Sequence, residues 1–278
     1  PIDDLDALLA RDDIDAVIVA TPGFAHTDAV ERAFAAGKHV FVEKPMALTP
    51  DECDRMIRAR DAAGKKLMVG QVLRYIGVFN YTRELHAAGK LGDVIAVRTT
   101  RTSSGWGGAG RPWRNREDLS GGVLFEFSVH ELDFMMSLVG DAESVYAISH
   151  TTENAEWDYP DLYMLNIGFQ SGAMGQLAAG IADPVGHYGG EIIGTKGAVH
   201  FDARNGSLVA RIDGEEAKTL SYADIEPTEE PVRREVREFI EAVLNDTQVT
   251  IPGEEGRRVV RLAYAAKQSA REGRIVSL

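Results

Sequence analysis

Residues 15–45, DAVIVATPGFAHTDAVERAFAAGKHVFVEKP, set the fold class that we expect for this chain. The apolar run at 15–20 is typical of a strand buried on both faces. Residues 26–36 have helical spacing and are followed by a glycine that can end a helix. The next strand is expected at 39–42. A strand, a helix and a strand with short connections predict a right-handed crossover in a parallel sheet.

The predicted parallel sheet extends on both sides of this stretch. A helix at 49–63 and a strand at 66–70 follow it, and a helix at 2–11 precedes it. Parallel sheets bind ligands in the crevice beyond the carboxyl ends of their strands. Three segments should meet there, and we expect the chemistry in them: Thr21-Pro22, Glu43-Lys44-Pro45 and residues 71–74.

From about residue 76 the pattern changes to short strands joined by tight turns. A helix at 78–88, a strand at 94–102, a loop at 103–120 and a helix at 121–139 come first. Asn-Gly at 205–206 and Asp-Gly at 213–214 are typical of hairpins. The other expected elements are strands at 143–152, 161–170, 173–181, 190–194, 197–202, 207–212 and 216–221, and helices at 230–245 and 254–272. We therefore predict an α/β unit at 1–75 and an α+β unit at 76–278, the latter with a large, open, mainly antiparallel sheet and flanking helices.

The predicted strand around residue 165 is apolar on both faces. Tyr163, Leu165 and Ile167 line one face, and Leu162 and Met164 lie on the other. A sheet of this kind has a core on one side and offers the other to a partner. We expect a homo-oligomer, a dimer or tetramer, that associates through the antiparallel sheet.

Composition limits the classes of partner. Lys and Arg total 30 against 43 Asp and Glu, which gives a net charge of −13 in 278 residues and a pI near 5.0. Nucleic acid and anionic membranes repel such a protein, so neither is an expected partner. No apolar run reaches the roughly eighteen residues of a membrane span. The single cysteine, Cys53, fits a reducing, cytoplasmic compartment.

Lys44 is the first candidate for chemistry. A lysine at the carboxyl end of a parallel strand points into the ligand crevice. Glu43 can pair with it, and Pro45 can fix the turn that directs the ammonium. The alternative is a loop lysine in a surface ion pair.

Glu126, His130 and Asp133 form the second candidate group. Their spacing of i, i+4 and i+7 places all three on one face of the predicted helix. A carboxylate one turn away can orient an imidazole for proton transfer. Only one histidine lies on this face, so a two-histidine metal site is excluded there. The alternatives are a solvated charged stripe, or a core histidine satisfied by its carboxylate.

Two loops carry weaker signals. The loop after residue 20 could be a simple turn in which His26 has a structural role. Alternatively, its backbone amides could bind a phosphate or ribose. The loop at 103–120 offers aromatic faces for sugar rings and guanidinium groups for carboxylates, but could equally be a lid or a subunit contact. Its candidate residues are Trp106, Arg111, Trp113 and Arg114. No G-x-G-x-x-G motif connects a predicted strand to a helix as dinucleotide binding requires. The sequence GWGGAG at 105–110 has the spacing of the motif, but it lies in this loop.

The ordered set of segments resembles the glucose–fructose oxidoreductase/inositol dehydrogenase (Gfo/Idh/MocA) family. The likeness runs essentially from Pro1 to Leu278. Beyond the first 45 residues it rests on these segments: VGQVLRYIGVFNYTRELHAAGKLGDV at 69–94, SGGVLFEFSVHELDFMMSLVGD at 120–141, EIIGTKGAVHFD at 191–202 and REFIEAVLNDTQVTIPGEEGRRVVRLAYAAKQSAREGRIV at 237–276.

The resemblance implies a two-domain enzyme that binds NAD or NADP in a Rossmann domain and its substrate in the C-terminal domain. It makes Lys44, His130 and Glu126 the catalytic group, with His130 as the acid/base. On the cofactor side it implies the residues Thr21, Pro22, His26, Glu43, Lys44 and Arg74. For the substrate, the residues expected are Lys44, Trp106, Arg111, Trp113, Arg114, His130 and Asp133. No metal is expected.

Two features depart from the family pattern. Many members have Asp where this chain has Glu126. The family's first strand, glycine-rich turn and second strand would precede Pro1, a βαβ unit of about 30 or more residues. We therefore expect the sequence to be a truncated part of a complete enzyme. An intact mass equal to that of the 278-residue chain would contradict this.

The expected function is hydride transfer between NAD(P) and a secondary alcohol or ketone of a sugar, sugar acid or cyclitol. Three alternatives stay open. The chain could sense a ligand without turnover, use NAD transiently for glycoside cleavage, or be a fragment whose sheet serves assembly.

Overall fold

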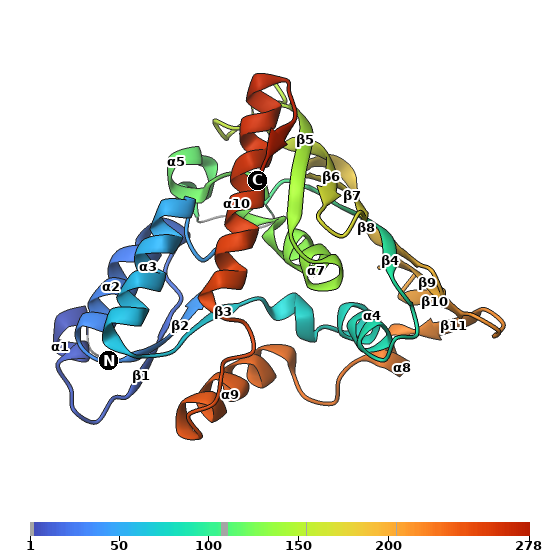
Figure 1. Cartoon of the computed structure of the whole chain (residues 1–278). Helices are drawn as coiled ribbons and strands as arrows, with labels where there is room; N and C mark the ends of the chain where they lie inside the picture. The colour runs from blue at the N-terminus through green and yellow to red at the C-terminus, as the bar shows by residue number, and fades with distance from the viewer. Residues whose placement is uncertain (1–2, 107–110, 154, 204) are drawn as a thin grey trace.

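The computed structural model describes residues 3–106, 111–153, 155–203 and 205–278, which form two sheets with a long helix between them (Figure 1). The first sheet is parallel, in the order β1-β2-β3, as the sequence predicts. Its strands and helices are α1 Leu5–Leu9, β1 Ala16–Val19, α2 His26–Ala35, β2 His39–Glu43, α3 Pro50–Ala63 and β3 Leu67–Gly70. Short 3-10 turns follow β1 and β3, at Gly23–Ala25 and Val72–Tyr75.

The start of α3 shows how the sequence specifies these elements. The Thr49 hydroxyl accepts a hydrogen bond from the Glu52 amide, and the Glu52 carboxylate accepts one from the Thr49 amide. This reciprocal capping box satisfies amides that the helix leaves free. Pro50 occupies the first turn, and Gly64 ends the helix with a φ of 62°. The predicted helix at 49–63 is confirmed.

The prediction that β1 is buried on both faces is wrong. Ile18 is 53% exposed, whereas Val40, Phe41 and Val42 of β2 are almost fully buried. β2 lies in the middle of the sheet with helices packed against it, and no described element covers Ile18. A continuous apolar run identified the strand but not the cover on each of its faces.

The second sheet has nine strands in the described residues, in the order β11-β10-β9-β8-β4-β7-β6-β5-β12. Only the β4–β7 pair is parallel, so the sheet is mainly antiparallel as predicted. The hairpin turns at 205–206 and 213–214 join β9 to β10 and β10 to β11. The strands are β4 Val94–Ser104, β5 Ala142–His150, β6 Leu162–Phe169, β7 Met174–Gly180, β8 Ala182–Gly194, β9 Gly197–Asp202, β10 Ser207–Ile212, β11 Lys218–Ser221 and β12 Val276–Ser277.

β8 is longer than the predicted strand at 190–194, since it begins at Ala182. The sequence pattern does not predict the first part of β8, because it contains Pro184 and several glycines, which are poor strand formers. Gly190 has a packing role in it: a Cβ there would lie 2.6 Å from the Phe201 ring. The glycine lets the ring pack against the strand.

The predicted continuous helix at 121–139 is also wrong. It consists of α6 Val123–Glu126 and α7 Val129–Val139, separated by Phe127 and Ser128. Glu126 and His130 therefore belong to different helices. Helices α4 Gly77–Ala87, α5 Glu117–Ser120 and α8 Tyr222–Ile225, and a 3-10 turn at Pro112–Asn115, complete this region. The glycines of GWGGAG at 107, 108 and 110 lie outside the described residues.

α10 Gly253–Glu272 connects the two sheets. It packs on α3 and β3 of the first unit and on α7 and β5 of the second (Figure 1). Val259, Leu262 and Ala263 are buried in these contacts. α9 Pro231–Leu244 contacts β2. The predicted division at 75/76 stays a prediction, and the last two helices reach elements on both sides of it.

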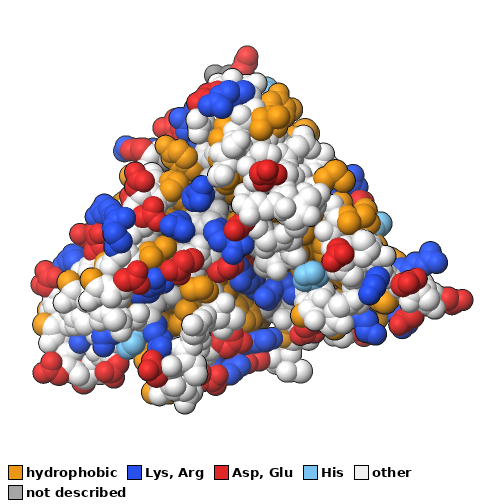
Figure 2. Space-filling model, in the orientation of Figure 1, with side chains coloured by type: hydrophobic (Ala, Val, Ile, Leu, Met, Phe, Trp, Pro, Cys, Tyr) orange, Lys and Arg blue, Asp and Glu red, His pale blue; other side chains and the backbone are white. Residues whose placement is uncertain are grey.

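Charged side chains are intermixed on the face shown in Figure 2, where acidic and basic groups alternate over α2 and α3. Arg55 of α3 forms an ion pair with Glu31 of α2. Of the helices within the described ranges, none combines the length and apolar character that crossing a membrane requires.

Candidate active site

A cavity of about 380 Å³ lies beyond the carboxyl ends of β1 and β2. Both units contribute to it: the loops after the two strands form one side, and the 3-10 turn at 112–115 and α6 form the other. It lies where a parallel sheet offers a ligand crevice. The lining residues are Ala20, Thr21, Pro22, Gly23, Glu43, Lys44, Arg111, Trp113, Arg114 and Glu126.

Lys44 lies just past β2, and its ammonium donates a 2.8 Å hydrogen bond to the backbone carbonyl of Glu126. The peptide bond to Pro45 is cis. Burial lowers the pKa of Lys44 below its usual 10.5, and the charge of Arg101 lowers it further, while Glu126 and Glu43 oppose the shift.

Glu43 does not form the expected ion pair with the Lys44 ammonium. Its carboxylate accepts a hydrogen bond from the Lys44 backbone amide, with Oε2 3.2 Å from the nitrogen. The lysine side chain extends instead to Glu126 of α6. Both residues still line the cavity.

Glu126 does not orient His130. Its carboxylate pairs with Arg114, whose Nε lies 3.3 Å from Oε2. The break at Phe127 and Ser128 turns the two side chains away from the predicted common face. Across the described ranges, the buried Nδ1 atom of His130 has no hydrogen-bond partner.

His130 lies at the start of α7, beside Lys44 and Arg101 but outside the set of residues that line the cavity. Burial lowers the pKa of its imidazole well below 6.5, and the charges of Lys44 and Arg101 lower it further. The ring is therefore neutral at pH 7, which is the form that can accept a proton.

His26 connects the two loops that form the sheet side of the cavity. It is fully buried, and its ring nitrogens lie 2.9 Å from the Pro45 carbonyl oxygen and 2.7 Å from the Thr21 carbonyl oxygen. It therefore supports the cavity wall without lining it. Thr21 and Pro22 line the cavity directly.

Arg74 and Asp133 lie away from the cavity and bind each other. Both guanidinium–carboxylate contacts are short, 2.6 and 2.7 Å, and a third joins Arg74 to Glu255 at 2.9 Å. Asp133 is fully buried. These contacts occupy the groups that the sequence assigned to cofactor and substrate. The two residues form an ion pair between the 3-10 turn after β3 and α7, and their predicted cofactor and substrate roles stay predictions.

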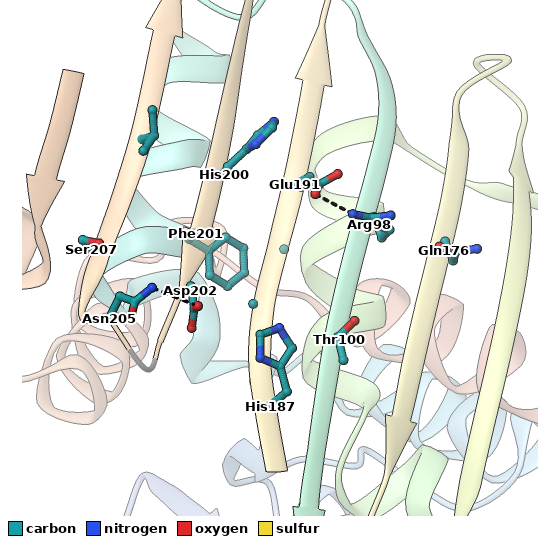
Figure 3. Close-up of a pocket in the computed structure, with 13 residues that line it drawn as sticks. Arg98, Thr100, Gln176, His187, Glu191, His200, Phe201, Asp202, Asn205 and Ser207 are labelled. Atoms are coloured by element: carbon teal, nitrogen blue, oxygen red, sulfur yellow. Dashed lines mark hydrogen bonds and ion pairs between the residues drawn. The ribbon is translucent and has the colours of Figure 1, made fainter. Parts of the chain in front are cut away.

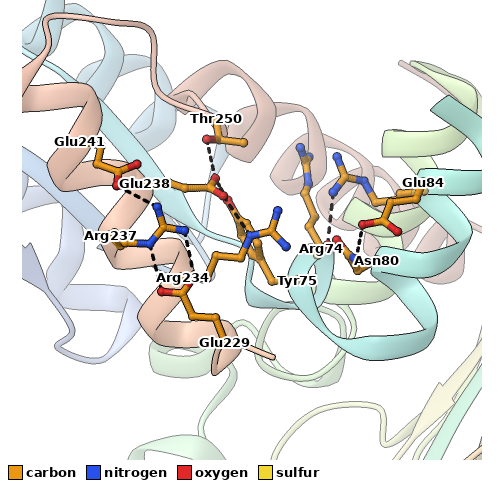
Figure 4. Close-up of polar contacts among 11 residues, drawn as sticks. Arg74, Tyr75, Asn80, Glu84, Glu229, Arg234, Arg237, Glu238, Glu241 and Thr250 are labelled. Carbon is orange, nitrogen blue, oxygen red and sulfur yellow. Dashed lines mark hydrogen bonds and ion pairs between the residues drawn. The ribbon is translucent and has the colours of Figure 1, made fainter. Parts of the chain in front are cut away.

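The polar network continues beyond this ion pair (Figure 4). The Tyr75 hydroxyl donates to Glu238 at 2.8 Å, and Arg237 pairs with Glu229 and Glu241. The Tyr75–Glu238 hydrogen bond joins α9 to the 3-10 turn after β3. It stabilises the fold at a distance from the cavity.

The tryptophans and arginines of the 103–120 loop divide into two groups. Trp113, Arg111 and Arg114 line the cavity. Trp106 does not, and its indole N–H donates to the Tyr159 hydroxyl at 2.7 Å. That hydroxyl donates to the Arg114 carbonyl at 2.6 Å. Trp106 and Tyr159 thus hold the backbone of Arg114.

Sequence reasoning missed Tyr159 and Arg101. Both come from segments far along the chain from the residues they contact, and nothing in their local sequence marks them. Among the described residues, no group of three His, Cys, Asp or Glu side chains is placed to hold a metal ion.

Comparison with known families decides the identity of the fold. The model of an oxidoreductase family, Gfo/Idh/MocA, described as an NAD-binding Rossmann fold, matches residues 1–71, and the model of its C-terminal alpha/beta domain matches residues 83–278. This chain belongs to the Gfo/Idh/MocA family. The resemblance found in the sequence is confirmed.

Known members of the Gfo/Idh/MocA family show how far the likeness extends. A 2,7-anhydro-N-acetylneuraminate hydratase of Escherichia coli K12 is 32% identical over 217 residues, 76% of this chain and 58% of the hydratase. The myo-inositol 2-dehydrogenase of Thermotoga maritima is 27% identical over 278 residues, 98% of this chain and 82% of the dehydrogenase. This chain thus spans less than two thirds of the hydratase's length.

A solved structure in the Gfo/Idh/MocA family has the same fold. The aldose-aldose oxidoreductase of Caulobacter crescentus, complexed with glycerol, has a TM-score of 0.87 and 28% sequence identity. The match covers 98% of this chain and 82% of that one. The predicted fold class, a Rossmann-type parallel sheet followed by a large, open, mainly antiparallel sheet with flanking helices, is confirmed.

Proposed function

We propose that this protein is an NAD(P)-dependent oxidoreductase that transfers a hydride between the nicotinamide and a secondary alcohol or ketone of a sugar, sugar acid or cyclitol. The observation that carries the proposal is the position of Lys44. Its ammonium lies in a cavity at the carboxyl ends of parallel strands, next to an imidazole that burial and positive charge keep neutral.

The chemistry of the cavity fits the nicotinamide end of the cofactor. Ala20 and Pro22 give one side an apolar surface beside the backbone of Gly23, and Lys44 adds a polar group. Thr21, Pro22, Glu43 and Lys44 would hold this end, with His26 behind them. NAD and NADP are both candidates. A bound NAD(P) accepts a hydride from an alcohol or donates one to a ketone.

Lys44 and His130 would have different roles at the substrate oxygen: Lys44 would hydrogen-bond to it, and His130 would transfer its proton. Lys44 uses one ammonium proton for the Glu126 carbonyl, so the others are available to a substrate hydroxyl. Neutral His130 would take the hydroxyl proton during oxidation and return it during reduction. General acid–base help of this kind contributes about 10²–10⁴ in rate. Glu126 contributes through its carbonyl oxygen and its pairing with Arg114.

The far wall of the cavity supports a ring-shaped, hydroxylated substrate. The Trp113 indole offers an apolar face, and Phe24 packs edge-on against it with ring centroids 6.4 Å apart. Arg111 and Arg114 add guanidinium groups that suit hydroxyls or a carboxylate. The names of the relatives, which act on an anhydro sugar acid and on inositol, support the same class.

A second candidate follows from the hydratase relatives. Addition of water changes no net oxidation state, so any hydride that NAD takes from the substrate would have to be returned to it in the same cycle. In that case product forms with catalytic NAD and no reduced cofactor accumulates. Product analysis beside cofactor absorbance separates the two candidates.

We infer that the outer face of the second sheet joins subunits. Ile148 is 52% exposed, Met164 52% and Met174 65%, on the adjacent strands β5, β6 and β7. Exposed apolar side chains gathered on one face favour a partner. The opposite faces of these strands are buried in the core, which confirms the predicted inward set around Leu165.

A hollow of about 450 Å³ lies on the same face (Figure 3), and Gly189 and Gly190 are among the residues that line it. His187 and the Arg98–Glu191 ion pair border it. Charges of both signs on one patch suit a two-fold interface, in which the patch meets a copy of itself.

The buried thiol of Cys53 fits a reducing, cytoplasmic setting.

The experiment that tests the function is a panel of polyols, sugar acids and cyclitols with NAD and NADP, followed by the absorbance of reduced nicotinamide. Turnover with at least one compound supports the proposal. Cofactor binding without turnover or product would contradict it.

A further inference from the structure

Two consecutive backbone carbonyls, at the break between α6 and α7, accept hydrogen bonds from side chains of distant elements. The Glu126 carbonyl accepts from Lys44 at 2.8 Å, and the Phe127 carbonyl accepts from Arg101 at 3.0 Å. Inside an unbroken helix such carbonyls accept from the helix's own amides. One cation from the end of β2 and one from β4 therefore hold the same short break.

The guanidinium of Arg101 is itself held in one position. Its Nη1 also donates to Glu131 at 3.0 Å, and the Tyr188 hydroxyl donates to the same carboxylate oxygen at 2.9 Å. Its central carbon lies 4.2 Å from the Phe127 ring centroid and 5.3 Å from that of Tyr188. Glu131 is fully buried, so it needs this cation close by. A planar group with several donors suits this site, and an ammonium does not replace it.

We propose that Arg101 is a positioning residue that fixes the α6–α7 break and thereby sets where Lys44 and His130 stand relative to each other. Lys44 contacts the residue before Phe127, and His130 lies in the first turn of α7. Loss of the Arg101 contact would let both groups move. The inference rests on the proposed function, because it assigns these two groups to one reaction.

The positive charge of Arg101 also acts on the imidazole of His130. Burial lowers the pKa of His130 most, and Lys44 and then Arg101 lower it further. Arg101 thus favours the neutral ring as well as its position.

The variants Arg101→Ala and Arg101→Lys test the proposal, with Arg55→Ala as the control. Arg55 lies on α3, away from the α6–α7 break and from the proposed subunit interface, and pairs with Glu31. We expect Arg101→Ala to lower kcat by about 10²-fold, as a small misplacement of reacting groups does. The Kd for NADH should stay close to the wild-type value, and added guanidinium should restore part of kcat. Arg101→Lys should keep more of the wild-type kcat than Arg101→Ala but not all of it, and Arg55→Ala should keep the wild-type kcat.

A wild-type kcat in Arg101→Ala, or a loss that guanidinium does not reverse, would overturn the proposal. Amide hydrogen exchange over residues 123–133 gives a readout that needs no turnover. The exchange should be faster in Arg101→Ala than in wild type or Arg55→Ala, and slower again with guanidinium. Unchanged exchange overturns the inference even if the polyol panel succeeds, and faster exchange supports it even if that panel fails. If Arg101→Ala does not fold, Arg101→Lys is judged by the same two measurements.

Discussion

The ammonium of Lys44 and the backbone carbonyl of Glu126 lie 2.8 Å apart and join positions 82 residues apart in the sequence. Lys44 follows a strand of the parallel sheet, and Glu126 ends a short helix of the second unit. The cavity lies between these two segments. The candidate site therefore depends on both units and on the contact that holds them together.

The pH dependence of oxidation should reflect two lowered pKa values. Burial, Lys44 and Arg101 lower that of His130 below 6.5, so the base stays neutral to lower pH than an ordinary histidine. Burial and Arg101 lower that of Lys44 below 10.5, so its proton is lost earlier on the alkaline side. A profile of kcat/KM against pH should show an acid limb below pH 6.5 and an alkaline limb below pH 10.5. An acid limb at or above 6.5 would contradict the role of His130.

Removal of Arg74 should destabilise the fold more than it weakens cofactor binding. Arg74→Met leaves the Asp133 carboxylate buried without its partner, which costs about 3–5 kcal/mol of unfolding free energy. Arg116→Met is the control, since its pair with Asp118 is exposed to solvent and should contribute little to the unfolding free energy. Urea unfolding and NADH titration measure both effects. An unchanged unfolding free energy with lost NADH affinity would restore the sequence-based cofactor role.

Glu235 of α9 should make the protein less stable as the pH rises. It is 1% exposed, and burial, with the charges of Glu43 and Asp133, raises its pKa from 4.5 to about 9. Between these values the folded state keeps a proton that the unfolded state releases, so its stabilisation is complete below pH 4.5 and is lost toward pH 9.

Glu235→Gln should remove this dependence of the unfolding free energy on pH. The variant should therefore become increasingly more stable than wild type as the pH rises. Urea unfolding at several pH values measures it, with the exposed Glu241→Gln on the same helix as control. A slope unchanged from wild type would show that Glu235 is ionised in the folded protein.

The outer face of the second sheet should control the oligomeric state. Met164→Asp combined with Met174→Asp places charge on two exposed positions of the neighbouring strands β6 and β7, and should shift the protein to monomer. Val232→Asp on α9, which is 47% exposed, is the control. Light scattering after size exclusion gives the mass. A wild-type protein that is monomeric at all concentrations would contradict the proposed interface.

The sequence predicts the parallel unit well because its signals are local. The apolar run of β2, the capping residues of α3 and the glycine after it act over a few positions. The hairpins at 205–206 and 213–214 are found for the same reason. The position of Lys44 at the crevice follows from the strand order alone.

The remaining features depend on contacts that local patterns do not contain. Residues 121–139 are apolar and helical in character, and the break at Phe127 is held by Arg101 from another element. Asp133 has the spacing of a site residue, but Arg74, 59 positions away, takes both of its oxygens. The cover over a strand face, as at Ile18, is likewise a property of the assembled fold.

The most direct test compares wild type with Lys44→Ala and His130→Ala in the polyol panel, with Lys38→Ala on the exposed surface as control. The account predicts that wild type and Lys38→Ala reduce NAD or NADP with the same polyol. It also predicts that each of the other variants folds, binds NADH and loses about 10²–10⁴ in kcat. Wild-type turnover in Lys44→Ala or His130→Ala would contradict it.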